Sequence, residues 1–313
     1  MEKSHNLRSS IYLSLTALIW GVAFVFQSMG NDYMQPLTFT SSRYLLGGLV
    51  LVPILLIKIK HPRFLADSDE IPVTRAPKRP TLLSGVMCGL ALGAATAFQQ
   101  YGLQHTTVGK AGFITTMYII LTPIFGLLFG KKCGVRVWIG AASAVVGMYL
   151  LCITDGFSVA WGDVLVLICA VLFTVHIMLI DRFAPHTNGV LLSCVQFFVA
   201  AFSCGVGALL FEQPSLSQFA DGLIPVLYCG IMSSGAAYTL QILGQRNFNP
   251  TVAAMIMSME SVVSAVASYI AYACGWLSTD QSMTAWQILG CVIMFAAVMF
   301  VQLPNRKHRV EQN

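Results

Sequence analysis

Charged residues are scarce in this sequence. Asp, Glu, Lys and Arg together make up 10% of its 313 residues, as 18 basic and 13 acidic side chains, whereas apolar residues make up 56%. A typical soluble domain is about 25% charged, and so few charges could not cover the surface of a water-soluble fold of this length. The composition therefore excludes a cytosolic globular enzyme, a nucleic-acid-binding protein and a disordered tail protein.

Motifs with a defined chemistry are missing as well. The nine cysteines include no C-x-x-C pair and lie mostly in apolar stretches, which indicates neither a disulfide framework nor a metal site. A Walker A loop is absent, as are the H-E-x-x-H and G-x-S-x-G motifs, and this argues against ATP-driven pumping and the common hydrolase mechanisms. We expect no cofactor, no metal ion and no catalytic residue.

Long apolar stretches are what the chain has instead. A helix needs about 20 mostly apolar residues to cross a hydrocarbon core of about 30 Å. Ten stretches meet this requirement, near residues 9–30, 36–58, 81–104, 108–130, 135–153, 160–181, 189–211, 221–244, 250–274 and 284–303. They do not alternate as the strands of a membrane barrel do, and in lipid the backbone of each span must satisfy its own hydrogen bonds. The sequence predicts an all-α integral membrane protein with ten transmembrane helices.

Basic residues alternate from loop to loop. All of them except Arg43 and Lys110 lie before the first span, after the last span, or in the loops that follow spans two, four, six and eight. The loops after spans one, five, seven and nine carry acidic residues and no Lys or Arg. Under the positive-inside rule, this pattern predicts a multi-pass protein of the cytoplasmic (plasma or inner) membrane with both termini cytoplasmic. The Pro-containing loop 59–80 is then a flexible cytoplasmic connector.

Two segments indicate an internal repeat. Residues 112–123 in the fourth span resemble residues 250–261 in the ninth, and the following spans open alike, at 137–140 and 286–290. Each half then contains five spans, and an odd number makes the second half enter the membrane from the opposite face. Inverted repeats are typical of secondary transporters. We predict two inverted five-helix repeats, residues 1–155 and 156–305, followed by a cytoplasmic tail, 306–313.

Several further stretches form a recognisable set. They are Trp20-Gly21, Arg43, Phe98 to Phe113, the run that ends Leu121-Thr122-Pro123, His176 to Arg182, and Ala236 to Arg246. On these residues the chain resembles the EamA-like family of the drug/metabolite transporter superfamily. The resemblance implies a ten-helix, two-repeat carrier that exports or exchanges small organic solutes. Two features depart from the family pattern: the usual Glu-Pro pair of span nine is Glu260-Ser261, and the acidic residue often found just after spans four and nine is missing.

Two charged residues within spans are candidate functional residues. Glu260 is the only acidic residue well inside a span, where a charge costs about 2.5–3.5 kcal/mol on the insertion scale. It either binds a cationic group or takes up and releases a proton during transport, or it is a structural anchor that is protonated or paired with Arg43. Arg43 either contacts the substrate or braces a contact between helices.

Polar and aromatic side chains recur at helical spacing in four spans. We predict that they line a substrate pathway together with Arg43 and His176, and the set is Trp20, Phe24, Gln27, Gln100, Thr115, Tyr118, Thr122, Tyr238 and Gln241. The alternative for each group is a hydrogen bond between helices, worth about 0.6 kcal/mol on average. His176 is either a proton relay or a packing residue. Pro123, in the middle of the fourth span, predicts a hinge.

One face of the third span carries only glycine. Gly85, Gly89 and Gly93 form a doubled G-x-x-x-G pattern, which predicts either close helix packing within the chain or a homodimer contact.

The sequence as a whole favours a secondary transporter that works by alternating access. Its expected partners are a small organic metabolite, amino acid or drug-like substrate and the lipid bilayer, with proton coupling through Glu260 and a homodimer as open alternatives. An uncoupled uniporter or channel in which Glu260 is structural remains an alternative. A membrane-embedded enzyme or sensor is a third, although one Glu and one Arg are a narrow basis for catalysis.

Overall fold

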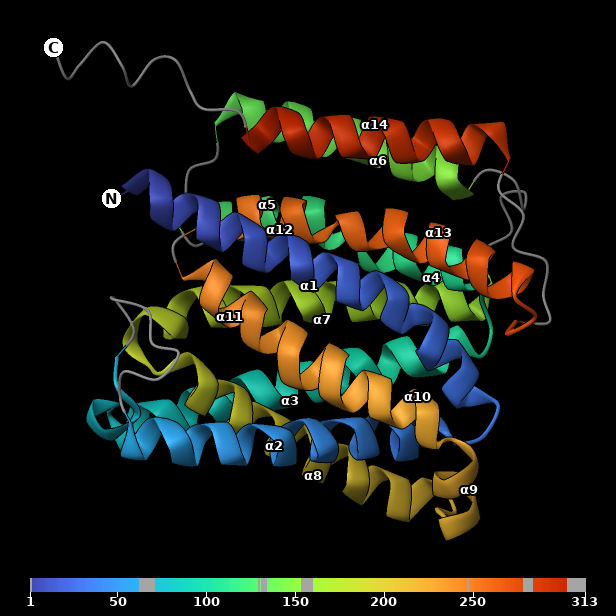
Figure 1. The fold of residues 1–313 in the computed structure, drawn as a ribbon. Helices are drawn as coiled ribbons and strands as arrows, with labels where there is room; N and C mark the ends of the chain where they lie inside the picture. The colour runs from blue at the N-terminus through green and yellow to red at the C-terminus, as the bar shows by residue number, and fades with distance from the viewer. Residues whose placement is uncertain are drawn as a thin grey trace, which may run out of the picture.

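The computed structural model describes residues 2–61, 71–128, 130, 134–152, 160–246, 248–277 and 284–302. Within these ranges all regular secondary structure is helical. Figure 1 shows the long helices side by side, running back and forth along one direction. The fold class predicted from composition, an all-α membrane protein, is confirmed at this level.

The helices have the following bounds. The α-helices are α1 (Glu2–Asn31), α2 (Pro36–Lys60), α3 (Lys78–Leu103), α4 (Val108–Thr115), α5 (Tyr118–Leu128), α6 (Val135–Cys152), α7 (Trp161–Phe183), α8 (Gly189–Phe211), α9 (Leu216–Asp221), α10 (Leu223–Leu227), α11 (Thr239–Gln245), α12 (Pro250–Met257), α13 (Met259–Ala273) and α14 (Ala285–Gln302). Two short 3₁₀ helices, η1 (Val73–Arg75) and η3 (Ala184–His186), and a π-helix, η4 (Tyr228–Tyr238), complete the set.

Eight helical stretches of the described chain are long and apolar enough to cross a membrane. They are Leu7–Asn31, Pro36–Lys60, Arg79–Leu103, Val108–Leu128, Trp161–His186, Gly189–Phe211, Leu223–Gln245 and Pro250–Ala273, and they match eight of the predicted spans. The fifth and tenth predicted spans correspond to α6 and α14, whose apolar parts, Val135–Gly147 and Ile288–Val301, are shorter. A membrane crossing by these two helices therefore stays a prediction.

The predicted loop 59–80 is shorter than expected at both ends. Helix α2 continues to Lys60, and α3 already begins at Lys78. Between them η1 is ordered, while residues 62–70 lie outside the described chain, as does the predicted tail 306–313.

Helices from the two halves of the sequence pack on one another throughout. Helix α2 packs on α8, α3 packs on both α7 and α8, and α1 packs on α13 and on the α10–η4–α11 segment. Helices α6 and α14 pair at one edge of the bundle (Figure 1). The interior of the protein is consequently an interface between the two halves of the chain.

Two of the long stretches are broken helices. Between α4 and α5 the hydroxyl of Thr116 donates to the Phe113 carbonyl at 2.8 Å, and between α12 and α13 the hydroxyl of Ser258 donates to the Met255 carbonyl at 2.7 Å. Such side-chain bonds compete with the helical ladder. Both breaks therefore occur where a hydroxyl residue offers the backbone another partner.

Pro123 is not at the break. It lies inside α5, whereas α4 ends at Thr115 and α5 begins at Tyr118. The proline removes the donor that would bond the Ile119 carbonyl, so it weakens the first turns of α5 without ending the helix. Its role as a hinge stays a prediction.

The two similar segments also have similar helices. Helices α4 and α12 have eight residues each, and a break follows both. Aligning the two breaks pairs Val108 with Pro250, whereas the sequence comparison paired residue 112 with residue 250, a difference of about one helical turn. The internal repeat itself stays a prediction.

The glycine face of α3 packs against α8. A Cβ built at Gly89 would lie 2.7 Å from the Gln196 carbonyl oxygen and 2.7 Å from Val199 Cβ, and one at Gly85 would lie 2.3 Å from Val195 Cγ1. Of the two alternatives for this G-x-x-x-G pattern, the structure supports close packing within the chain, because α8 occupies the surface that a homodimer would use.

The substitution Gly89→Ala is expected to lower the free energy of unfolding by about 2 kcal/mol, because a backbone carbonyl cannot rotate away from the added methyl group. Thermal unfolding in detergent micelles measures the effect. Gly109→Ala is the matched control, since within the described residues nothing lies within 4 Å of a Cβ built there, and its effect should stay below about 0.5 kcal/mol. Equal effects of the two substitutions would contradict the close contact.

Candidate functional site

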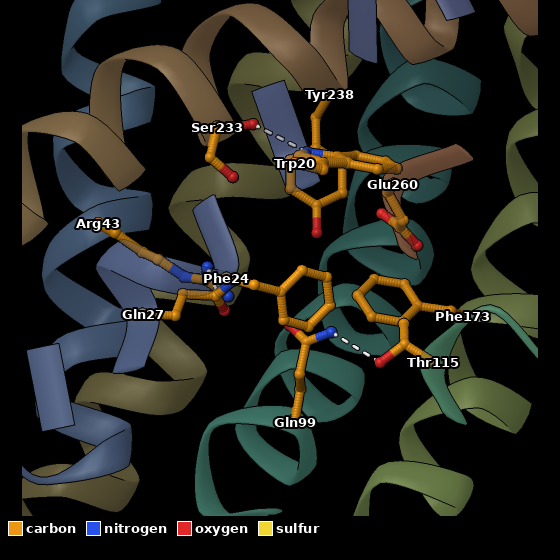
Figure 2. A pocket seen from close by; sticks show the side chains of 10 residues that line it. All are labelled: Trp20, Phe24, Gln27, Arg43, Gln99, Thr115, Phe173, Ser233, Tyr238 and Glu260. Carbon is orange, nitrogen blue, oxygen red and sulfur yellow. Dashed lines mark hydrogen bonds between the residues drawn. The ribbon is translucent and has the colours of Figure 1, made fainter. Parts of the chain in front are cut away.

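A small cavity of about 20 Å³, close to the volume that one water molecule needs, lies near the middle of the long helices, between the two halves of the chain. Side chains from α1, α2, α3, α4, α7, η4 and α13 form its wall (Figure 2). The lining residues that the sequence predicted are Trp20, Phe24, Gln27, Arg43, Thr115, Tyr238 and Glu260. Those it missed are Gln99, Phe173 and Ser233.

Arg43 is a buried cation at this wall. Its side chain is only 1% exposed, and Nη1 donates to Gln27 Oε1 at 2.9 Å. The guanidinium lies over the ring of Tyr44, 4.9 Å from its centroid. Its Nε and Nη2 have no hydrogen-bond partner in the described part of the chain. Arg43 is therefore held in place, but its charge is not matched by a described carboxylate.

Glu260 is a buried acid at the same wall. It is 3% exposed and lies in the first turn of α13, directly after the break at Ser258. A negative side chain is favoured there by the helix dipole. The hydroxyl of Tyr118, the first residue of α5, donates to Glu260 Oε1 at 2.8 Å. This hydrogen bond joins the two broken helices, and both residues lie just after a break.

Aromatic rings cover much of the remaining wall. The rings of Trp20 and Tyr238 lie 4.5 Å apart between centroids, and Trp20 Nε1 donates to the Ser233 carbonyl at 3.3 Å. Figure 2 shows the ring of Phe24 between the side chains of Arg43 and Phe173, with Phe173 below Glu260. Ser233 and Tyr238 both belong to the π-helix η4, and π-helical turns are often found at functional sites. The site thus combines one cation, one acid and an apolar aromatic surface.

Neighbouring glutamines in α3 have different roles. Gln99 lines the cavity, and its Nε2 donates to Thr115 Oγ1 at 3.2 Å. Gln100, which the sequence analysis selected, donates to the Gln27 carbonyl and to Asn31 Oδ1, both at 2.8 Å. Consecutive residues differ by about 100° on a helix, and only the packing of α3 determines which glutamine faces the cavity. Phe173 and Ser233 had no distinguishing sequence signal.

Four more predicted residues are buried outside the cavity wall. Tyr118 is linked to the cavity wall by its hydrogen bond to Glu260. Thr122 Oγ1 and Gln241 Oε1 have no hydrogen-bond partner within the described ranges. His176 Nε2 lies 3.1 Å from Gln196 Oε1, and the histidine ring meets Tyr238 edge-on at 6.1 Å between centroids. The predicted roles of these residues in a pathway stay predictions.

Outside the cavity, two acidic residues connect the ends of helices by hydrogen bonds. Asp163, at the start of α7, accepts hydrogen bonds from Thr106 Oγ1 at 2.6 Å and from Lys110 Nζ at 3.2 Å. Glu212, directly after α8, accepts from the backbone N–H groups of Leu37 and Thr38 at 2.8 and 2.7 Å. Each joins a helix of the first half to one of the second. Lys110, which lies outside the cavity wall, is therefore part of a contact between the halves.

Comparison with known proteins gives consistent matches over the whole length. The model of the EamA-like transporter family matches twice, at residues 7–153 and 160–303. An uncharacterized transporter of Archaeoglobus fulgidus is 28% identical over 303 residues, 96% of this chain and 88% of that protein. The uncharacterized inner membrane transporter YedA of Escherichia coli K12 is 26% identical over 292 residues, 90% of this chain and 87% of its own.

A solved crystal structure matches with a TM-score of 0.71 over 98% of this chain and 99% of that chain. At 18% identity, this match concerns the fold alone. The family match is independent of it and extends over nearly all of the helices described above. The resemblance noted in the sequence is thereby confirmed, and the chain belongs to the EamA-like transporter family as a multi-pass membrane transporter.

Proposed function

We propose that the protein is a secondary transporter that moves a small organic solute by alternating access, with the cavity as the solute site. The observation that carries the proposal is the cavity itself. It lies between the two halves of a membrane protein and contains two buried, oppositely charged side chains, Arg43 and Glu260. Such residues are costly in a membrane and usually face a solute or ion pathway.

Two inverted five-helix halves, with α6 and α14 as the fifth and tenth spans, account for the packing. When the two halves are exchanged, α1 corresponds to α7, and α13 corresponds to α4 and α5; α1 contacts α13, and α7 contacts α4 and α5. In the same way α3 corresponds to η4 and α8 to α2; α3 contacts α8, and η4 contacts α2. The α2–α8 and α6–α14 pairs map onto themselves. The double match of the family model supports the same division. Substrate sites between inverted repeats near the midplane are typical of secondary transporters.

The broken helices suit a rocking motion of the halves. The breaks before Tyr118 and Glu260 lie next to the cavity, where a small change in backbone angle would move the outer parts of both helices. The start of α1 and the end of α14 lie at the same end of the bundle (Figure 1). This agrees with the basic-residue pattern, and we propose that both termini are cytoplasmic.

Glu260 is the proposed coupling residue. Its carboxyl group is buried and held by one neutral hydroxyl donor, so protonation and solute binding can compete for the same oxygens. A proton taken up on one side and released on the other would drive the solute in the opposite direction. This makes the protein an exporter or exchanger in its membrane, with the proton as the exchanged ion.

Flux in vesicles tests this function. Solutes that stabilise the purified protein, chosen from amino acids, nucleosides, vitamins and organic cations, are measured with and without an imposed pH gradient. For one-for-one exchange, a gradient of about one pH unit should change the accumulated solute about tenfold. Glu260→Gln should retain counterflow but lose this response.

Four outcomes would contradict parts of the proposal. A wild-type flux indifferent to the gradient would exclude proton coupling. If the flux of the Glu260→Gln variant still responded to the pH gradient, Glu260 would be excluded as the coupling residue. Flux that does not saturate and shows no counterflow would indicate a channel, and product formation or ligand binding without flux would indicate an enzyme or a sensor.

A further inference from the structure

We infer that the hydrogen bond between Tyr118 and Glu260 is a lock between the two broken helices. It holds while Glu260 is ionised and has bound no solute, and it weakens when Glu260 binds a proton or the solute. The inference rests on the proposed function, because it assumes that Glu260 couples the proton to the solute. It goes further by making Tyr118 a positioning residue that keeps a carrier without proton or solute from changing sides.

The lock lies where the two broken helices meet. Helix α4 packs on α13, and α12 packs on α5; Figure 1 shows these two contacts toward opposite ends of the bundle. Tyr118 is the first residue of α5, and Glu260 is the second residue of α13. Their hydrogen bond therefore lies between the two contacts and restrains both of them.

Entry of a solute requires one of these two contacts to open. The cavity of about 20 Å³ has room for about one water molecule, so a solute fits only after helices move apart. Alternating access opens one end of a transporter at a time, which separates α4 from α13 or α5 from α12. Because Tyr118 belongs to the first half of the chain and Glu260 to the second, either movement has to stretch or break their hydrogen bond of 2.8 Å.

The charge of Glu260 sets the strength of this hydrogen bond. A hydrogen bond to an ionised carboxylate is about twice as strong as one between neutral groups, and both partners are buried, with Tyr118 2% and Glu260 3% exposed. On protonation, the proton binds a carboxylate oxygen and Tyr118 keeps its own hydroxyl proton, so the bond becomes one between neutral groups. A solute bound at the same oxygens competes with Tyr118 directly. The lock is therefore strongest when Glu260 has bound neither.

Glu260 is the group in this region that changes charge near neutral pH. Titratable or charged side chains lie around it on four helices, and they are Tyr118 of α5, Cys169 of α7, Tyr238 of η4 and Arg43 of α2. Tyrosine and cysteine are mostly neutral at that pH, and arginine stays charged. The consequence is a rule for exchange: the carrier changes sides with a proton or with the solute, and stays locked with neither.

Flux in vesicles tests the lock with Tyr118→Phe, which removes only the hydroxyl group. At alkaline pH on both sides, where protonation is rare, we expect the net downhill flux of the solute to rise about tenfold, because a hydrogen bond to a charged group no longer opposes the change of sides. Accumulation driven by a pH gradient should fall, while counterflow is retained. Tyr228→Phe is the matched control, since it removes another tyrosine hydrogen bond between the halves, to the Ile19 carbonyl at 3.2 Å, and should leave coupling unchanged.

Hydrogen exchange of the purified full-length protein measures the lock without any flux. After correction for the intrinsic rate, backbone exchange in α5 and α13 of the wild type should become faster as the pH is lowered, because protonation of Glu260 weakens the bond that restrains local opening. In Tyr118→Phe and in Glu260→Gln it should be fast at every pH. The comparison with Glu260→Gln decides the question if Tyr118→Phe does not fold.

The inference is overturned if Tyr118→Phe is as tightly coupled as the wild type, if Tyr228→Phe loses coupling equally, or if exchange in α5 and α13 shows no pH dependence that Glu260→Gln abolishes. Failure of the proposed function is distinguishable. A pH dependence of exchange that both variants abolish, without flux of any solute, would keep the lock and overturn the transporter. Saturable, proton-coupled flux that Tyr118→Phe leaves unchanged would keep the transporter and overturn the lock.

Discussion

Replacing Glu212 by alanine should lower the free energy of unfolding by about 3 kcal/mol, because a buried charged acceptor is lost and the donors it satisfied remain. Glu212 is 6% exposed and accepts from Leu37 N, Thr38 N, Thr38 Oγ1 and Tyr101 OH at 2.6–3.1 Å. Gln35, at the N-cap of α2, makes no side-chain cap bond within the described chain. Glu212 caps this helix from the end of α8 instead, and N-terminal caps are worth about 1 kcal/mol on their own.

Thermal unfolding of the purified protein measures this loss. Asp221→Ala is the matched control, since it also removes a carboxylate near the same end of the bundle but from an exposed position, and its effect should stay below about 0.5 kcal/mol. Glu212→Gln, which keeps one acceptor oxygen, should fall between the two. If Glu212→Ala were no more destabilising than Asp221→Ala, the capping role would be wrong.

Replacing Gly21 by valine should reduce transport to background and destabilise the protein by about 3 kcal/mol. A Cβ built at Gly21 would lie 2.4 Å from Val263 Cβ and 2.8 Å from the backbone oxygen of Glu260. Neither atom can rotate away, because Val263 Cβ is bonded directly to the backbone and the Glu260 carbonyl belongs to the first turn of α13. Helix α1 approaches that turn closely only because residue 21 has no side chain. The added groups would displace Glu260 from the cavity.

Flux of the solute identified by the binding screen, together with thermal unfolding, checks this result. The double variant Gly21→Ala, Val263→Gly removes the clash at residue 263, because glycine has no Cβ, but not the one with the carbonyl. We therefore expect it to regain stability before it regains transport. Gly109→Val, at a glycine whose Cβ would meet nothing within 4 Å in the described structure, serves as the control. Normal transport by Gly21→Val would show that the close approach of α1 is not needed.

The positions of most spans could be predicted from the sequence. Which face of each helix points into the cavity could not be predicted. A run of apolar residues is sufficient to identify a membrane helix, because lipid imposes the same requirement wherever the span lies. Which side of α3 faces the cavity depends on how α3 packs on α7 and α8, and for this reason Gln100 was selected when Gln99 lines the wall. The helix breaks at Thr116 and Ser258 were missed for a similar reason, since hydroxyl residues are common within membrane helices that do not break.

The sequence alone determined the membrane class and the family, and it selected Arg43 and Glu260 as candidate functional residues, because charge in an apolar span is costly in any fold. Only the tertiary structure decided that these two side chains share one cavity, that Tyr118 holds Glu260, and that Glu212 caps a helix far from it in the chain. These contacts join residues more than a hundred positions apart. They depend on how helices from both halves pack, and no local pattern of residues encodes that packing.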